Sequence, residues 1–155
     1  RTCVGFDVKL HLIKPLGFSL DEKYVKRSSL DYMPFLDYVV YENIEDFYSK
    51  NPNATIFYLT RYGHKTPAQV DYSLVESNDL YFMFGKESTG IPYEILHKNI
   101  ENCYRIPTTD KIRSLNLSNC VALVLFQALH NLDYPNLIDH EPDTLKGEFF
   151  IDNFK

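Results

Sequence analysis

The sequence predicts an α/β domain in which a mostly parallel β-sheet is covered by helices on both faces. Three observations support this fold class. Segments with strand patterns alternate along the chain with segments with helix patterns. The run Leu80–Phe84 is apolar throughout, which is typical of a strand buried on both faces. The longest helical pattern spans residues 117–132, and its apolar positions follow the helical period. Such alternation favours parallel strands joined by crossover helices.

The first part of the chain contains two predicted strands and one predicted helix. Residues 9–13 alternate polar and apolar side chains, as in a half-buried strand. Ser19 or Asp21 can cap a short helix that continues to about residue 28. A second short strand is expected at Tyr38–Tyr41.

The rest of the chain continues the alternation. Asn43 is expected to cap a helix that ends near residue 50, and a strand is expected at Thr55–Leu59. Pro92 suits the first turn of a helix that ends near residue 98, and residues 103–106 form the last predicted strand. Ligands on parallel sheets bind in loops at the carboxyl ends of strands. The loops to inspect therefore follow Leu59, Phe84 and Ile106.

Size, charge and cysteine content narrow the class of protein. The 155 residues fit a single domain, 1–155. Three distant cysteines without a Cys-x-x-Cys pair disfavour a disulfide framework and a zinc site, and they fit a reducing, cytoplasmic compartment. No apolar run approaches the ~18 residues of a membrane span. Because the net charge is −5, any surface for nucleic acid must be a local patch.

The loop 85–92 could carry a ligand. Its two glycines, Gly85 and Gly90, have Walker A spacing, but Ile91-Pro92 replaces the Lys-Ser/Thr that would hold phosphate and magnesium, which excludes an NTPase. The glycines permit close backbone approach, so the loop either wraps a ligand or is only a tight strand-to-helix turn. The spacing favours neither interpretation.

A dense polar cluster precedes the longest helix. It consists of Ser114, Asn116, Ser118 and Asn119. Capping a helix requires one such residue, and four exceed that need, which favours a polar binding site. The five histidines have no metal-ligand spacing, so no metal is expected. Cys120 is interpreted as a small core residue rather than a nucleophile.

A cluster of positive charges lies on the helix predicted after residue 19. Lys23, Lys26 and Arg27 occupy about two turns, with Tyr24 and Tyr32 nearby. The cationic groups could contact RNA phosphates while an aromatic ring stacks on a base. The alternative, a solvated helix face, is favoured by the charge pattern alone.

Three segments carry a specific resemblance to a known family. Residues 84–92, 105–107 and 113–119 resemble the second and third motifs of the SPOUT superfamily of RNA 2′-O-methyltransferases. Residues 10–18, with 30–32 after them, resemble its TrmL (YibK/CspR-like) tRNA branch. The resemblance extends over residues 1–137 in the family's order.

The resemblance implies a fold and a cofactor. SPOUT proteins have a parallel sheet whose C-terminal part forms a deep trefoil knot, and members of this branch are homodimers. Their knot loops bind S-adenosylmethionine, which becomes S-adenosylhomocysteine. By resemblance, the residues of the cofactor pocket are Leu59, Gly85, Ile106, Ser114, Leu115 and Asn119.

The resemblance also implies the reaction, 2′-O-methylation of the wobble nucleotide of tRNA, cytidine or uridine at position 34. Arg1 aligns with the arginine implicated in activating the ribose. A permanently charged guanidinium suits holding a phosphate and stabilising an alkoxide better than acting as a base. Glu87, Ser114 and Asn116 match the family's polar motif residues and are assigned to positioning.

The chain departs from the family pattern in two ways. The family's first strand and its Asn-Thr-Gly-Asn stretch are expected before Arg1, and Phe126 and Gln127 stand where the branch often has Tyr and Glu.

The alternative substrates are ribosomal RNA and another tRNA site. The alternative of a different class is a non-catalytic RNA- or cofactor-binding module.

Overall fold

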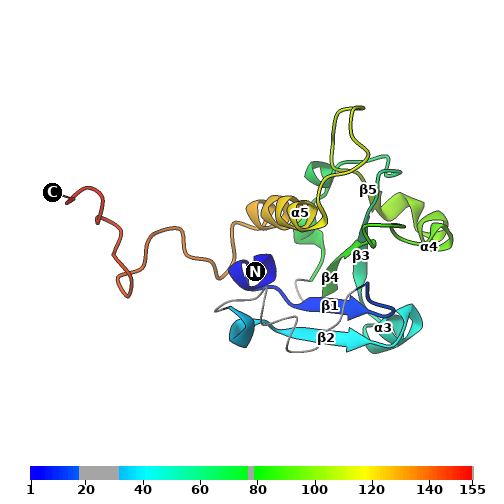
Figure 1. Cartoon of the computed structure of the whole chain (residues 1–155), viewed down its shortest axis with the longest axis horizontal. Helices are drawn as coiled ribbons and strands as arrows, with labels where there is room; N and C mark the ends of the chain where they lie inside the picture. The colour runs from blue at the N-terminus through cyan, green and yellow to red at the C-terminus, as the bar shows by residue number, and fades with distance from the viewer. Residues whose placement is uncertain (18–31, 77–78, 155) are drawn as a thin grey trace.

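The computed structural model describes residues 1–17, 32–76 and 79–154, and it confirms an α/β architecture with parallel strands (Figure 1). The strands form two parallel sheets. One pairs β1 (Leu10–Ile13) with β2 (Tyr38–Tyr41). The other has the order β4-β3-β5, with β3 (Thr55–Leu59) between β4 (Leu80–Phe84) and β5 (Cys103–Tyr104).

A single continuous sheet was expected, and the described strands instead pair as two. Side chains join the sheets at β1 and β4, where the rings of His11 and Tyr81 meet edge to face at a centroid distance of 5.1 Å. The backbone hydrogen bonds between the described strands therefore form only within each sheet, and the packing of aromatic side chains joins the two sheets.

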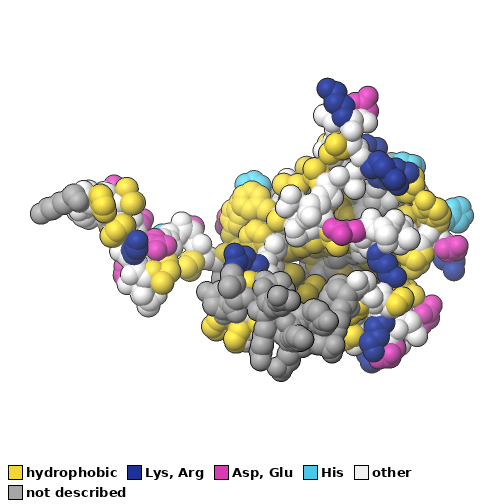
Figure 2. Space-filling model, viewed as in Figure 1, with side chains coloured by type: hydrophobic (Ala, Val, Ile, Leu, Met, Phe, Trp, Pro, Cys, Tyr) yellow, Lys and Arg dark blue, Asp and Glu magenta, His cyan; other side chains and the backbone are white. Residues whose placement is uncertain are grey.

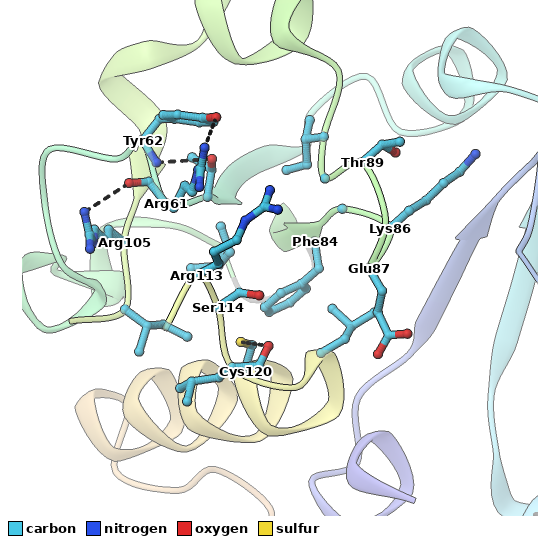
Figure 3. A pocket seen from close by; sticks show the side chains of 18 of the residues that line it. Arg61, Tyr62, Phe84, Lys86, Glu87, Thr89, Arg105, Arg113, Ser114 and Cys120 are labelled. Atoms are coloured by element: carbon cyan, nitrogen blue, oxygen red, sulfur yellow. Dashed lines mark hydrogen bonds between the residues drawn. The ribbon is translucent and has the colours of Figure 1, made fainter. Parts of the chain in front are cut away.

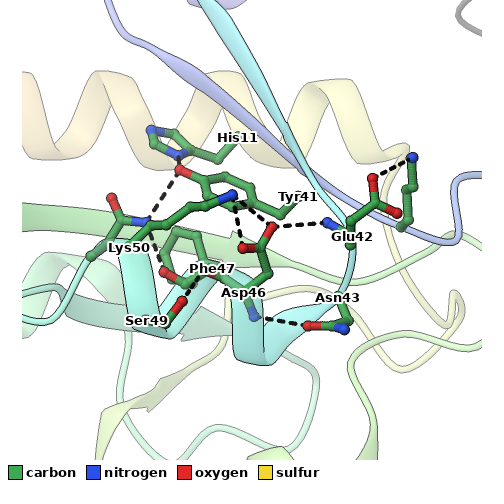
Figure 4. Close-up of polar contacts among 10 residues, drawn as sticks. His11, Tyr41, Glu42, Asn43, Asp46, Phe47, Ser49 and Lys50 are labelled. Carbon is green, nitrogen blue, oxygen red and sulfur yellow. Dashed lines mark hydrogen bonds and ion pairs between the residues drawn. The ribbon is translucent and has the colours of Figure 1, made fainter.

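The helices follow the capping and periodicity signals. Asn43 accepts a hydrogen bond of 2.8 Å from the Asp46 backbone N–H and starts α3 (Ile44–Lys50), as expected (Figure 4). α4 (Tyr93–Lys98) follows Pro92, and α5 (Leu117–Asn131) is the longest helix. Sequence patterns did not reveal α1 (Thr2–Gly5) or the short 3₁₀ helices, which are Met33–Phe35, Pro67–Gln69, Tyr72–Leu74 and Ile100–Asn102.

Two strand predictions need correction. The last strand ends at Tyr104 rather than Ile106, because the Arg105 backbone N–H donates to the Lys65 carbonyl at 2.8 Å and leaves the ladder with β3. The β4 strand is half-buried along its whole length rather than buried on both faces.

Helices cover both faces of the three-stranded sheet, as the alternation of β3 side chains shows. Ile56 and Tyr58 pack with Phe47 of α3 and Leu96 of α4 in one core cluster. Phe57, on the opposite face, packs in a second cluster that includes Ala128 of α5. Because successive side chains of β3 point to opposite faces of the sheet, this strand contributes to both core clusters.

One predicted helix and one candidate surface lie outside the described residues. These are the helix near residues 19–28 and the cationic residues Lys23, Lys26 and Arg27. Among the helices that the structure does describe, none has the length and apolar character needed to cross a membrane.

The segment after α5 extends away from the rest of the molecule in Figure 1. Six of the 21 acidic residues and two of the 16 basic residues lie after Leu132. Four of the five net negative charges therefore belong to this segment, and the remainder of the chain is nearly neutral.

Candidate active site

A cavity of about 510 Å³ lies where β3, β4 and β5 end (Figure 3). Its walls come from the segments that follow Leu59, Phe84 and Tyr104, with α5 closing one side. These are the loops in which a parallel sheet is expected to bind a ligand, so the cavity lies at the position that the sequence indicated for a ligand site.

The wall after β4 is a tight loop of close backbone contacts. The Gly90 N–H donates to the Lys86 carbonyl at 2.8 Å, and Gly90 has a φ of +74°, which disfavours a side chain. A Cβ atom on Gly85 would lie 2.1 Å from the Gly90 carbonyl carbon. The loop is therefore a tight turn, and it also forms one wall of the cavity.

The wall after β5 is tied to the loop after β3. The Thr60 N–H donates to the Tyr104 carbonyl at 2.9 Å, and Arg105 Nη1 donates to the Arg61 carbonyl at 3.4 Å. These bonds hold the two loops together beyond the end of the regular ladder.

The polar residues within 114–119 have different roles in the structure. Asn116 Oδ1 accepts from the Ser118 N–H at 2.9 Å and from the Ser118 hydroxyl at 2.5 Å, so Asn116 caps α5. Ser114 and Leu115 line the cavity. Asn119 is exposed and is not part of the cavity lining.

Most of the predicted site residues meet at this cavity. The lining includes Leu59, Gly85, Glu87, Ile106, Ser114, Leu115 and Asn116. Arg1 and Asn119 are not part of it. The Arg1 residue precedes α1, and its guanidinium lies 4.9 Å from the centroid of the Tyr32 ring.

An aromatic and cationic group at the rim of the cavity was not predicted from the sequence. Tyr62 and Tyr93 meet edge to face at a centroid distance of 5.8 Å, and their hydroxyl oxygens are 3.3 Å apart. Arg61 Nη2 donates to the Tyr62 hydroxyl at 2.8 Å, and its guanidinium carbon lies 4.9 Å from the Tyr62 ring centroid. The position of Arg61 and Tyr62 just after a parallel strand was a signal that could have found them.

The rim is positively charged although the chain is acidic. Among the lining residues, Arg61, Lys86, Arg105 and Arg113 oppose a single carboxylate, Glu87. Figure 3 shows Arg113 and Ser114 directed into the cavity. Figure 2, which has the view of Figure 1, shows Lys and Arg side chains on the upper part of the molecule. The local charge thus favours an anionic ligand despite the net charge of −5.

Cys120 contributes to the cavity from α5, although it was interpreted as a core residue. The thiol is half-buried and donates to the Leu115 carbonyl at 3.8 Å. Burial raises the pKa of the Cys120 thiol, which keeps it protonated and weakly nucleophilic near neutral pH. Within the described part of the chain, no group of acidic, histidine and cysteine side chains is arranged to hold a metal ion.

Comparison with known proteins identifies the family. A Listeria monocytogenes protein (serotype 4b, strain F2365) named as a tRNA (cytidine(34)-2′-O)-methyltransferase is 46% identical over 143 residues, covering 92% of this chain and 83% of that protein. A crystal structure of an RNA methyltransferase from Bacillus anthracis is 46% identical, covers 92% of this chain and 88% of that chain, and has a TM-score of 0.84. A structure concerned with 2-OH methylation of C/U34 on tRNA is 31% identical, covers 86% of this chain and 80% of that chain, and has a TM-score of 0.74. Because the sequence profile of the SpoU rRNA Methylase family matches residues 1–126, the chain belongs to this family.

Proposed function

We propose that this chain is an S-adenosylmethionine-dependent tRNA 2′-O-ribose methyltransferase that acts on the wobble nucleotide, cytidine-34 or uridine-34. The observation that carries the proposal is the cavity at the ends of β3, β4 and β5, where the matched motif segments converge in a SpoU-family chain. The Listeria relative, 46% identical, is named for methylation at cytidine-34, which supports the same substrate here.

The cavity fits the cofactor. SpoU methyltransferases use S-adenosylmethionine. A volume of about 510 Å³ lies in the range of pockets that enclose small ligands. Leu59, Ile106 and Leu115 offer apolar surface for an adenine ring, and the glycine loop brings backbone groups close. The residues that would hold the cofactor are Leu59, Gly85, Ile106, Ser114 and Leu115, with Asn119 included by resemblance.

When bound, S-adenosylmethionine supplies an electrophilic methyl group. Transfer of this methyl group to the ribose O2′ would require that oxygen to lose its proton to solvent, so the residues must orient the ribose and stabilise its oxygen. Arg113 points into the cavity and suits holding a phosphate beside that ribose, because its guanidinium stays charged and donates several hydrogen bonds. We assign to Arg1 the phosphate- and alkoxide-stabilising role implied by the family resemblance.

Three polar residues position the reactants in this proposal. The Asn116 Oδ1 atom is engaged by Ser118, so the group that Asn116 offers to the cavity is its amide donor. Ser114 offers a hydroxyl directed into the cavity, and Glu87 offers the single carboxylate among the lining residues. None of the three is assigned as the base.

The domain organisation, the knot and the dimer are part of the same proposal. The chain would form one methyltransferase domain with a C-terminal trefoil knot, and it would act as a cytoplasmic homodimer. The dimer is supported by the outer surface of α5, where Leu123 is 51% exposed and Phe126 is 54% exposed. A second copy would cover these side chains.

Methyl transfer tests the proposal. The chain is incubated with labelled S-adenosylmethionine and total tRNA, and nuclease digestion then locates the label. Label on the ribose of nucleotide 34, reduced in Arg113→Gln and unchanged in Lys98→Gln, is the expected result. Label at another tRNA site, or transfer to ribosomal RNA in a parallel reaction, would show that the substrate is not the wobble nucleotide. Cofactor binding without transfer to any RNA would favour the non-catalytic module.

A further inference from the structure

The pair Tyr62 and Tyr93 is ordered although it is exposed. Tyr62 is 42% exposed and Tyr93 is 65% exposed. Single exposed aromatics are common and need no explanation. These two rings are different, because their hydroxyls are hydrogen-bonded to each other and Arg61 donates to one of them. These hydrogen bonds restrict the orientations of two rings that, as exposed side chains, could otherwise rotate in solvent.

The pair lies at the rim of the cavity beside cationic side chains. Tyr62 follows β3, Tyr93 begins α4, and both line the cavity. Hydrogen bonds from Tyr93 and Arg61, with the nearby Arg61 and Arg113 charges, lower the pKa of Tyr62. Arg113 lines the same cavity as the pair, and its side chain points into that cavity (Figure 3).

This combination of groups matches the chemistry of single-stranded RNA. Proteins bind unpaired bases by stacking them on aromatic rings, while cationic side chains contact the phosphates. A ring pair with two guanidinium groups beside it supplies both elements. The cavity next to it is where the ribose must lie for methylation under the proposed function.

We propose that Tyr62 and Tyr93 form a stacking platform for an unpaired RNA base next to the methylated ribose, with Arg61 and Arg113 contacting the flanking phosphates. Both tyrosines are positioning residues that hold the nucleotide at the cavity mouth. This inference rests on the proposed RNA methyltransferase function.

The platform makes a prediction that a purely structural role does not. If the pair only ties the loop after β3 to α4, the hydroxyl contact is what matters, and Phe and Ala variants behave alike. Stacking requires the rings. Tyr62→Phe and Tyr93→Phe lose the hydroxyl bond but keep the ring, so they should retain most of the RNA affinity, whereas Tyr62→Ala and Tyr93→Ala should weaken it about 5- to 150-fold. The weakening should appear in KM for RNA more than in kcat, and cofactor affinity should not change.

A tryptophan reporter tests stacking directly, because the chain contains no Trp. Tyr93→Trp places one indole in the platform, and stacking on a base quenches its fluorescence. The probe is an anticodon stem-loop RNA, together with versions that lack one loop base at a time. Phe149→Trp is the matched control, because Phe149 is 63% exposed and lies in the C-terminal segment away from the cavity lining.

The expected result is saturable quenching of Tyr93→Trp that disappears when one particular base is absent. The control should not respond to that base. The stacking proposal would be wrong if quenching were the same with every probe, whichever base is missing. It would also be wrong if the Phe and Ala variants lost RNA affinity equally.

The wild-type assay separates this inference from the proposed function. If the chain methylates tRNA but Tyr93→Trp shows no base-dependent quenching, the platform alone is wrong. If base-dependent quenching occurs in a chain that transfers no methyl group, the methyltransferase function is wrong, and the tyrosine pair stacks an RNA base without a methylated ribose beside it.

Discussion

Gly85 and Gly90 lie so close that a Cβ atom on Gly85 would be 2.1 Å from the Gly90 carbonyl carbon and 2.3 Å from the Ile91 nitrogen. Both atoms belong to backbone, which cannot rotate away as a flexible side chain can. The shape of this cavity wall therefore depends on the absence of one methyl group.

Gly85→Ala should open the loop after β4 and weaken cofactor binding about fivefold or more. Forcing a methyl group into such a contact typically costs about 1–3 kcal/mol. Calorimetric titration with S-adenosylmethionine measures the affinity. Gly5→Ala is the control, since a Cβ atom on Gly5 meets nothing within 4 Å. Equal affinity in the two variants would contradict this account of the loop.

Asn116→Ala should destabilise the protein by about 1 kcal/mol, because the capping bond to the Ser118 N–H is removed. Asn116→Asp keeps an oxygen for the cap and should restore stability. It should not restore methyl transfer, which falls about tenfold or more because the amide donor is gone. Thermal unfolding and labelled methyl transfer measure the two effects. Full activity in Asn116→Asp would reduce the role of Asn116 to capping.

Stability should fall as the pH drops below about 6.5, the ordinary pKa of histidine, partly because of His11. Burial and the nearby Lys9 charge lower the pKa of His11 in the folded state. The unfolded chain then binds a proton more readily, so acid favours unfolding until the pH is below the folded-state pKa as well. In Figure 4, His11 lies against Tyr41, whose hydroxyl is 2.8 Å from Nδ1.

The His11 prediction is checked by urea unfolding at pH 7.5 and 5.5. His11→Gln cannot titrate, so the decrease in unfolding free energy between these pH values should be smaller than in the wild type. His140 provides a control of opposite sign, because hydrogen bonding to Asp139 raises its pKa. His140→Gln should not reduce the decrease, and the same decrease in wild type and His11→Gln would be evidence against this effect.

Arg113→Gln should weaken RNA binding and also make it less dependent on salt. Removing one phosphate interaction with a single strand reduces the slope of log K against log salt concentration by roughly 0.7. Binding to anticodon stem-loop RNA, measured over a range of salt concentrations, gives the slope. Lys98→Gln changes charge by the same amount on an exposed residue that does not line the cavity, and it should leave the slope unchanged.

Charge reversal of Lys26 and Arg27 should weaken tRNA binding and reduce its salt dependence in the same assay. The prediction comes from the sequence pattern of this segment. Unchanged affinity and slope would assign these side chains to a solvated surface.

Local signals predicted the local structure well. Asn43 and the apolar period of α5 were sufficient because capping and amphipathicity depend on residues a few positions apart. The end of β5 was mispredicted because Arg105 bonds to Lys65, a partner distant in sequence. A strand's length depends on its neighbour, which a single segment does not specify.

The sequence was sufficient to indicate which loops and motif segments form the candidate site. Parallel topology directed attention to the segments after Leu59 and Phe84, and the cavity lies there. The proximity of Tyr62 to Tyr93 could not be read from the sequence, because it depends on how α4 lies beside the loop after β3. Capping by one residue of the polar cluster was anticipated, but the selection of Asn116 over its three polar neighbours needed the backbone geometry.

The placement of β5 beside β3 also has a consequence for the order of assembly. The first two walls of the cavity can form once β3 has paired with β4, but the third wall requires Tyr104 to bond with Thr60 across more than forty residues of chain. Contacts between such distant residues tend to form late in folding. A nascent chain that ends before α5 has no complete cavity, so a ligand that binds there selectively stabilises molecules that have finished folding.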